Sequence, residues 1–81
     1  MQKSNSPTFK ANLHCLKESW PSPFVAREQV SVFSGGTLNP RTLANHDSQN
    51  TGPKDRIRIG RKIAYPVDSL VEWMEQRSTK L

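Results

Sequence analysis

Side chains that form paired hydrogen bonds recur at helical spacing in the segment Asn-Pro-Arg-Thr-Leu-Ala-Asn-His-Asp-Ser-Gln, residues 39–49. Asn39 is a good helix N-cap because its side-chain oxygen can accept a hydrogen bond from a free amide of the first turn. Pro40 suits the first helical position, where no amide donor is needed. At about 100° per residue, four polar side chains share one face: Arg41, Asn45, Ser48 and, beside them, Gln49. Leu43 points the other way, so the segment predicts a helix with a thin apolar back and a face suited to another polar surface.

A run of basic side chains follows this helix: Lys54, Arg56, Arg58, Arg61 and Lys62. Asp55 is the only acidic residue in the same stretch. The chain has 81 residues and a formal net charge of +5, and this stretch holds much of the excess. A basic cluster on one short segment indicates a polyanionic partner. A solvated hairpin that carries its cations outward would give the same pattern, and composition alone leaves both interpretations open.

The basic run also contains a predicted β-hairpin, with four apolar residues: Ile57, Ile59, Ile63 and Tyr65. A two-residue turn at residues 60–61 would oppose Ile59 to Lys62 and mix the two faces. A three-residue loop, residues 60–62, opposes Ile59 to Ile63 and Ile57 to Tyr65. Because directly opposed residues share a face, this loop keeps the four apolar groups together. We therefore predict the three-residue loop, with Arg61 and Lys62 at an exposed tip.

Two further helices are expected around these elements. The first spans Phe24 to Phe33, with Val30 and Phe33 facing the core, although its short apolar pattern also suits a strand. Residues 34–36, Ser-Gly-Gly, form the turn after it. The last helix opens at Pro66 and runs to about Arg77. Its apolar stripe consists of Val67, Leu70, Val71 and Met74, with Trp73 adjoining.

The N-terminal part of the chain is polar, and we expect a mobile tail over residues 1–12. Leu13, Leu16 and Trp20 have the spacing of one or two helical turns. We favour a short segment packed on the edge of the domain over a contact for a neighbouring copy. The Trp-Pro-Ser-Pro run at residues 20–23 predicts an extended connector.

Chemistry other than binding finds little support in the sequence. Cys15 is the only cysteine, and Cys15, His14 and His46 lack the spacing of a zinc site. His46 and Asp47 are sequence neighbours that point to different faces, so they form no proton relay. No apolar run reaches membrane-spanning length, and no signal peptide is evident. We predict a cytoplasmic protein that is not an enzyme and uses no cofactor, metal, small-molecule ligand or membrane.

Several motifs stand in a characteristic order between Phe24 and about Gln76: Arg41-Thr42-Leu43-Ala44-Asn45, Gly52-Pro53, Ile59-Gly60-Arg61-Lys62, Tyr65, Leu70 and Trp73. This order resembles the winged helix-turn-helix domain of phage and mobile-element excisionases, the recombination directionality factors. The MerR-like DNA-binding domain and AlpA-type phage regulators are similar. The resemblance implies an α+β, mostly helical fold of three helices and a two-stranded hairpin wing over residues 23–77. A flexible arm, residues 1–22, would precede it, and a short tail, residues 78–81, would follow.

The resemblance also implies site residues. In that family the second helix enters the DNA major groove, and the wing reaches an adjacent groove or the backbone. The groove-facing positions would be Arg41, Thr42, Asn45, Ser48 and Gln49. The wing and its flank would contribute Lys54, Arg56, Arg58, Arg61 and Lys62. His46 stands where the family usually has a tryptophan, and we interpret it as a half-buried packing residue rather than a phosphate ligand.

The function that follows is sequence-specific binding of double-stranded DNA by an architectural excisionase. Such a protein binds repeats near an attachment site cooperatively, bends the DNA and promotes excision by an integrase. Its partners would be DNA, a tyrosine-type integrase and other copies of itself, in the bacterial cytoplasm and on the nucleoid when bound. An AlpA-like transcription regulator is the alternative. A protein-interaction module of the antirepressor type is a third, although such a module need not be basic.

Overall fold

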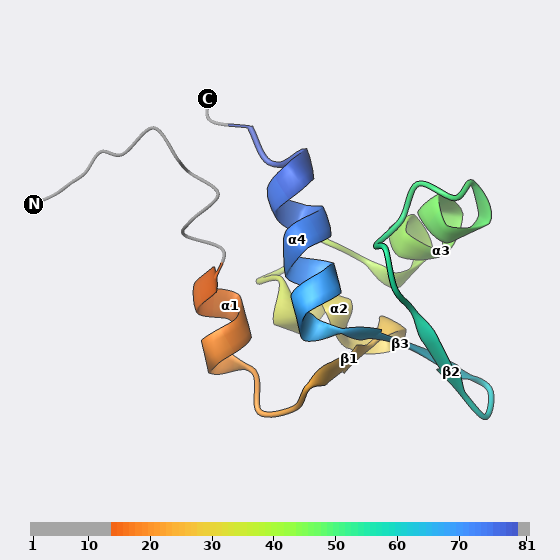
Figure 1. Ribbon diagram of the computed structural model, residues 1–81, viewed down its shortest axis with the longest axis horizontal. Helices are drawn as coiled ribbons and strands as arrows, with labels where there is room; N and C mark the ends of the chain where they lie inside the picture. The colour runs from red at the N-terminus through yellow and green to blue at the C-terminus, as the bar shows by residue number, and fades with distance from the viewer. Residues whose placement is uncertain (1–13, 80–81) are drawn as a thin grey trace, which may run out of the picture.

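The computed structural model describes residues 14–79, which form four α-helices, one 3₁₀ helix and a three-stranded antiparallel sheet (Figure 1). The elements in chain order are α1 (His14–Ser19), β1 (Phe24–Ala26), the 3₁₀ helix η2 (Arg27–Gln29), α2 (Val30–Phe33), α3 (Pro40–Ser48), β2 (Ile57–Ile59), β3 (Lys62–Pro66) and α4 (Val67–Arg77). The predicted α+β class is confirmed. The last helix begins directly after Pro66 and ends at Arg77, as its apolar stripe predicted.

The sheet has one strand more than predicted. Its order is β1-β3-β2, and β1 pairs antiparallel with β3. The prediction of a helix from Phe24 was wrong for its first three residues, because Val25 is fully buried opposite Tyr65 in the sheet. After η2 the helix itself is short, with Val30 and Phe33 buried as expected. The strand preference of this β-branched and aromatic segment therefore prevails.

The β2–β3 hairpin turns differently from the prediction. Ile59 pairs with Lys62, Arg58 with Ile63 and Ile57 with Ala64, so the turn is the two-residue one at Gly60 and Arg61. Gly60 has φ +63°, the positive value that glycine supplies at the first position of such a turn. The apolar groups are consequently split between the faces. Tyr65 points into the core and is fully buried, whereas Ile59 lies on the other face and is 61% exposed.

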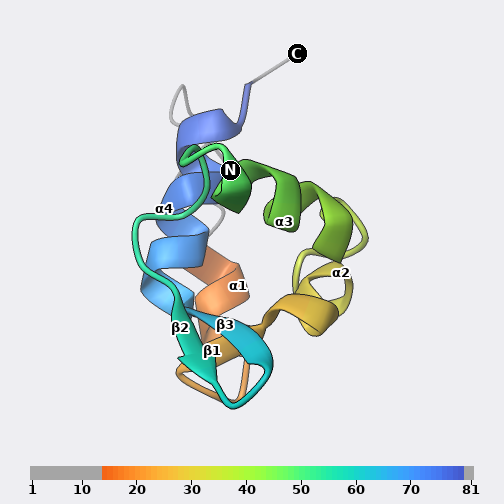
Figure 2. The same ribbon diagram turned by 90° about the vertical axis from the view of Figure 1, so that its right-hand side faces the viewer.

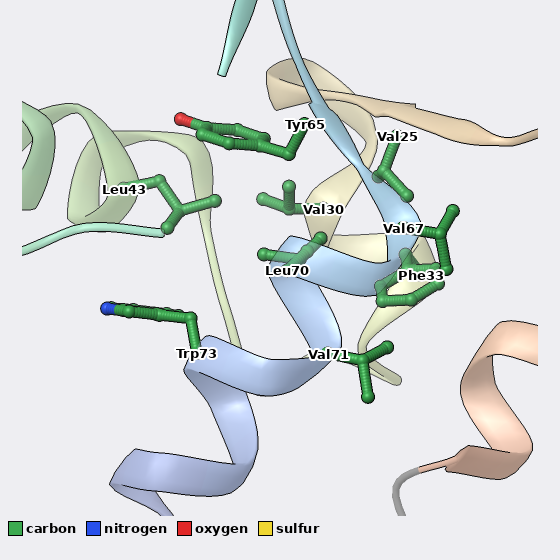
Figure 3. Close-up of a cluster of buried hydrophobic side chains, with 9 residues drawn as sticks. All are labelled: Val25, Val30, Phe33, Leu43, Tyr65, Val67, Leu70, Val71 and Trp73. Carbon is green, nitrogen blue, oxygen red and sulfur yellow. The ribbon is translucent and has the colours of Figure 1, made fainter. Parts of the chain in front are cut away.

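The core lies where α2, α3, β1, β3 and α4 meet (Figure 3). Its buried side chains are Val25, Val30, Phe33, Leu43, Tyr65, Val67, Leu70, Val71 and Trp73. Helix α4 contributes the most of these, whereas α3 contributes only Leu43. Burial of apolar area at this centre is the main force that holds the helices against the sheet.

Both ends of α3 are set by local signals. The Asn39 side chain accepts a hydrogen bond from the Thr42 amide (2.9 Å), which confirms the predicted cap, and Pro40 occupies the first turn. At the other end Asn50 has φ +61°, and the Thr51 amide donates to the His46 carbonyl (2.9 Å). This is the hydrogen-bond pattern of a Schellman cap, which closes a helix through one left-handed residue.

The turn between α2 and α3 is fixed by small residues. Gly35 and Gly36 have φ +67° and +89°, in the left-handed range that glycine adopts without strain. The buried Ser34 hydroxyl accepts from the Leu38 amide (2.9 Å), and the Ser31 hydroxyl donates to the Leu38 carbonyl (2.8 Å). The turn predicted at residues 34–36 is confirmed, and the connection to α3 continues from it to Asn39.

Helix α1 packs against α4 on the side opposite α3 (Figure 1). Leu16 and Trp20 lie against the core, and the Trp20 ring meets Phe33 edge to face at 5.3 Å. The part of the expected arm from residue 14 onward is therefore in contact with the domain. Residues 1–13, with the expected mobile tail and Leu13, lie outside the described residues, as do residues 80–81. Over residues 14–79, no helix has the length and apolar character needed to cross a membrane.

Candidate nucleic-acid interface

Helix α3 and the β2–β3 hairpin face the same side of the molecule (Figure 2). On α3 the polar face is exposed as predicted, and it carries Arg41, Asn45, Ser48 and Gln49 beside one another. Thr42 differs from the expectation, because it is half-buried and its hydroxyl donates to the Asn39 side chain (3.1 Å). Four of the five groove-facing positions implied by the resemblance thus share one exposed face, and the fifth lies at its edge.

The cations expected on the hairpin and its flank are exposed, but they differ in their partners. Within residues 14–79, no carboxylate lies within ion-pair distance of Lys54, Arg58 or Arg61. Lys62 instead pairs with Glu28 (2.8 Å), and Arg56 lies 3.7 Å from a carboxylate oxygen of Asp47. The sequence showed only Asp55 as an opposing acid, whereas the fold brings two others to the cluster.

Arg58 and Arg61 occupy different parts of the hairpin. Arg58 pairs with Ile63, which shares a sheet face with Tyr65, and the Tyr65 hydroxyl reaches α3. Arg58 is therefore on the sheet face turned toward α3, while Arg61 is at the turn. Together with Arg41 they place positive charge on both the helix and the hairpin of one side of the molecule.

A polar cluster that sequence reasoning missed connects α3 to the sheet. Asp47 is buried, and its Oδ2 accepts hydrogen bonds from the Arg27 guanidinium and the Tyr65 hydroxyl, both at 2.6 Å. Arg27 also donates to the Tyr65 oxygen (3.0 Å). The three residues come from η2, α3 and β3, and we call them the Asp47 cluster. Charged hydrogen bonds of this kind are short and directional, so the cluster fixes how α3 is oriented on the sheet.

Burial and the adjacent Asp47 carboxylate raise the pKa of Tyr65 to about 12, so its hydroxyl keeps the proton that it donates. Partial burial lowers the pKa of Arg27, but hydrogen bonds to Tyr65 and Asp47 outweigh this effect and raise it overall. The cluster is thus a neutral phenol and a guanidinium around one carboxylate. The only acid of α3 is thereby withdrawn from its exposed face.

The loop after α3 is built around this cluster. A Cβ atom added to Gly52 would overlap Asp47 Oδ1, so any other residue there would have to displace the Asp47 carboxylate. The neighbouring Thr51 carbonyl accepts from the Trp73 indole (2.8 Å), and the Thr51 hydroxyl bonds to His46 Nδ1 (2.8 Å). The His46 ring meets Trp73 edge-on at 5.2 Å. His46 is therefore a half-buried packing residue, as expected from the sequence.

The sequence contained a partial signal for these positions. The Gly-Pro pair at residues 52–53 was identified through the resemblance. The structure shows why Gly52 is a glycine, because its backbone closely approaches the Asp47 side chain. Arg27 and Asp47 are twenty positions apart, and neither stands in a recognisable pattern. Among residues 14–79 the structure also holds no group of three or more histidines, cysteines and acids that could bind a metal ion.

The exposed side of α3 and the hairpin can donate many hydrogen bonds and offers little negative charge. Arginine and asparagine can each form two hydrogen bonds to one base edge, and cations at a hairpin can reach phosphates.

A comparison of the chain with protein-family models found no match, and a search among curated proteins found none either.

Proposed function

We propose that this protein is a winged helix-turn-helix DNA-binding protein in which α3 is the recognition helix and the β2–β3 hairpin is the wing. The observation that carries the proposal is the shared side of these two elements (Figure 2). There Arg41, Asn45, Arg58 and Arg61 are exposed together, while the only acid of α3 is buried in the Asp47 cluster. A surface with exposed cations, whose only α3 carboxylate is buried, suits the binding of a polyanion.

In this account α3 lies in the major groove. Arg41 bridges guanine O6 and N7, and Asn45 bridges adenine N6 and N7. The wing cations contact phosphates or the neighbouring minor groove. Glu28 holds Lys62 at 2.8 Å, so Lys62 contributes less than Arg58 and Arg61. The Asp47 cluster fixes the orientation of α3 relative to the wing, which determines whether helix and wing can engage one duplex together.

The biological role that we propose is that of an excisionase. A recognition helix of nine residues and one short wing read only a few base pairs, too few for a unique genomic site. Specificity then requires several copies on adjacent repeats. An array of basic modules favours bent DNA, because the bending energy is offset by added contacts. A bent array beside an attachment site would help a tyrosine-type integrase to assemble an excision complex in the bacterial cytoplasm.

The test combines binding and recombination on the attachment region of the mobile element that encodes the protein. We expect stepwise, cooperative gel shifts and curvature of the bound DNA. Adding the protein to its cognate integrase should raise excision and leave integration unchanged or reduced. The matched control is Arg41→Ala with Asn45→Ala, which removes base contacts from exposed positions and leaves the core intact. Equal excision with and without the protein, together with activation of a promoter in a reporter assay, would replace this role with that of a transcription regulator.

A further inference from the structure

The exposed face of α3 has a different neighbour on each flank. On one flank a groove lies between Pro40 at the start of α3 and the hairpin residues Arg61 and Lys62. On the other flank a more apolar groove lies between α3 and the end of α4. It is lined by Leu38, Thr42, His46, Trp73, Met74 and Arg77. Helix α3 therefore sits between the wing and the C-terminal turn of α4 (Figure 2).

Arg77 is the cation of this second flank. It is exposed in the last turn of α4, and no carboxylate of residues 14–79 lies within ion-pair distance of it. Its guanidinium lies over the Trp73 ring, 5.1 Å from the ring centre. Trp73 is itself fixed by its hydrogen bond to the Thr51 carbonyl (2.8 Å) and by the His46 ring. Arg77 is thus held at the α3 flank with less rotamer freedom than a solvated arginine.

A helix in the major groove has a sugar–phosphate strand on each side. The wing can reach the strand on its own flank, but it lies on the wrong side of α3 to reach the other. We infer that Arg77 contacts a phosphate of this other strand, with the deoxyribose against the apolar wall of the groove formed by Leu38 and Met74. The inference rests on the proposed DNA binding and adds a contact outside both the recognition helix and the wing. In this arrangement DNA is held from two sides, by Arg61 on one and Arg77 on the other.

A contact of this kind carries charge but no sequence information. Neutralising one phosphate contributes about 0.9 to the slope of log affinity against log salt. Arg77→Gln should therefore weaken binding to specific and random duplexes by the same factor and reduce that slope by about 0.9. Arg77→Lys keeps the charge, so the slope should stay near that of the unaltered protein. A role confined to packing against Trp73 would change thermal stability without changing the slope.

The experiment is a fluorescence-anisotropy titration of the full chain with a labelled 20-base-pair duplex of random sequence at several salt concentrations. The matched control is Lys17→Gln, which removes a cation from α1 on the opposite side of α4 (Figure 1). Circular dichroism melts should show that each variant is folded at the titration temperature. We expect the slope to fall in Arg77→Gln and to stay unchanged in Lys17→Gln and Arg77→Lys.

Two outcomes separate this inference from the function on which it rests. If the unaltered protein binds the duplex and Arg77→Gln shows the same slope, the Arg77 contact is wrong and the proposed function stands. If the unaltered protein shows no salt-dependent binding at all, the proposed function fails and the Arg77 contact fails with it. A slope that falls equally in Arg77→Gln and Lys17→Gln would indicate a general effect of net charge, which would also overturn the inference.

Discussion

Helix α4 buries four apolar side chains, Val67, Leu70, Val71 and Trp73, whereas the neighbouring α3 buries only Leu43 and the carboxylate of Asp47. Helix α4 is held by buried apolar area, which depends little on pH or salt. Helix α3 is held in large part by charged hydrogen bonds, which have fixed geometry. Helix α4 therefore maintains the fold, while the contacts of α3 set the direction of its exposed polar face.

The largest effect is expected from removing apolar area under α4. Leu70 is fully buried at the centre of the core, so Leu70→Ala should lower the free energy of unfolding by about 2–5 kcal/mol. A domain of this size has little stability to lose, and much of the protein should unfold at moderate temperature. Chemical denaturation followed by circular dichroism measures the change. Glu72→Gln on the exposed face of α4 is the control. A loss of unfolding free energy below about 1 kcal/mol in Leu70→Ala would contradict the claim that buried apolar area holds α4.

Alkaline pH should act on the anchoring of α3 through Tyr65, the only tyrosine of the chain. Its pKa is about 12 in the folded state and about 10 when unfolded, so the folded state binds its proton more tightly. The stabilisation is complete below pH 10 and is lost as pH rises from 10 to 12, by about 3 kcal/mol in total. Ultraviolet absorbance of the phenolate should show a midpoint near 12. A midpoint near 10 in the folded protein would mean that the Tyr65 hydroxyl is neither buried nor held by Asp47.

Loosening the Asp47 cluster should affect α3 more than the rest of the fold. Asp47→Asn keeps the shape but removes the charge that Arg27 and Tyr65 share, which should cost about 1–3 kcal/mol. Gly52→Ala places a methyl group against Asp47 Oδ1 and should loosen the same contact. Hydrogen exchange should then increase in α3 and remain slow in the middle of α4. Uniform exchange along both helices would show that α3 has no separate anchor.

The elements that the sequence predicted well are those with local signals. Asn39 and Pro40 start α3, two glycines form the turn before it, and the stripe from Val67 defines α4. The missed features depend on residues far apart in the chain. Strand β1 forms because Val25 pairs with Tyr65, which lies forty positions later in the chain. The Asp47 cluster likewise joins η2 to α3 and β3.

The hairpin shows a different limit of sequence reasoning. Keeping its four apolar residues on one face favoured a three-residue loop, but Gly60 supports a two-residue turn and leaves Ile59 exposed. Local turn chemistry prevailed, and Tyr65 still reaches the core with Ile63 packed against it. The exposed polar face of α3 was predictable from helical spacing. The pairing of Lys62 with Glu28 was not, because it depends on where η2 lies.

The smallest effect on stability is expected on the exposed face of α3. Asn45→Ala removes a side chain that is exposed, so the free energy of unfolding should change by less than about 0.5 kcal/mol. Under the proposed function the same change weakens binding to the proper site by about 1–3 kcal/mol and relaxes base preference there. Competition gel shifts with specific and random duplexes measure both quantities. An equal loss on the two duplexes would show that this face touches only the backbone.

The most direct test of DNA binding through α3 and the β2–β3 hairpin is the salt dependence of affinity for a short DNA duplex. The measurement compares the unaltered protein with the double variant Arg58→Gln, Arg61→Gln. Both arginines are exposed on the hairpin, so the variant should remain folded. We predict that the unaltered protein binds at low salt, that its affinity falls steeply with added salt, and that the double variant reduces the slope by about 1.8, as expected for two lost phosphate contacts. Absence of binding at low salt, or identical slopes for the two proteins, would contradict the proposal.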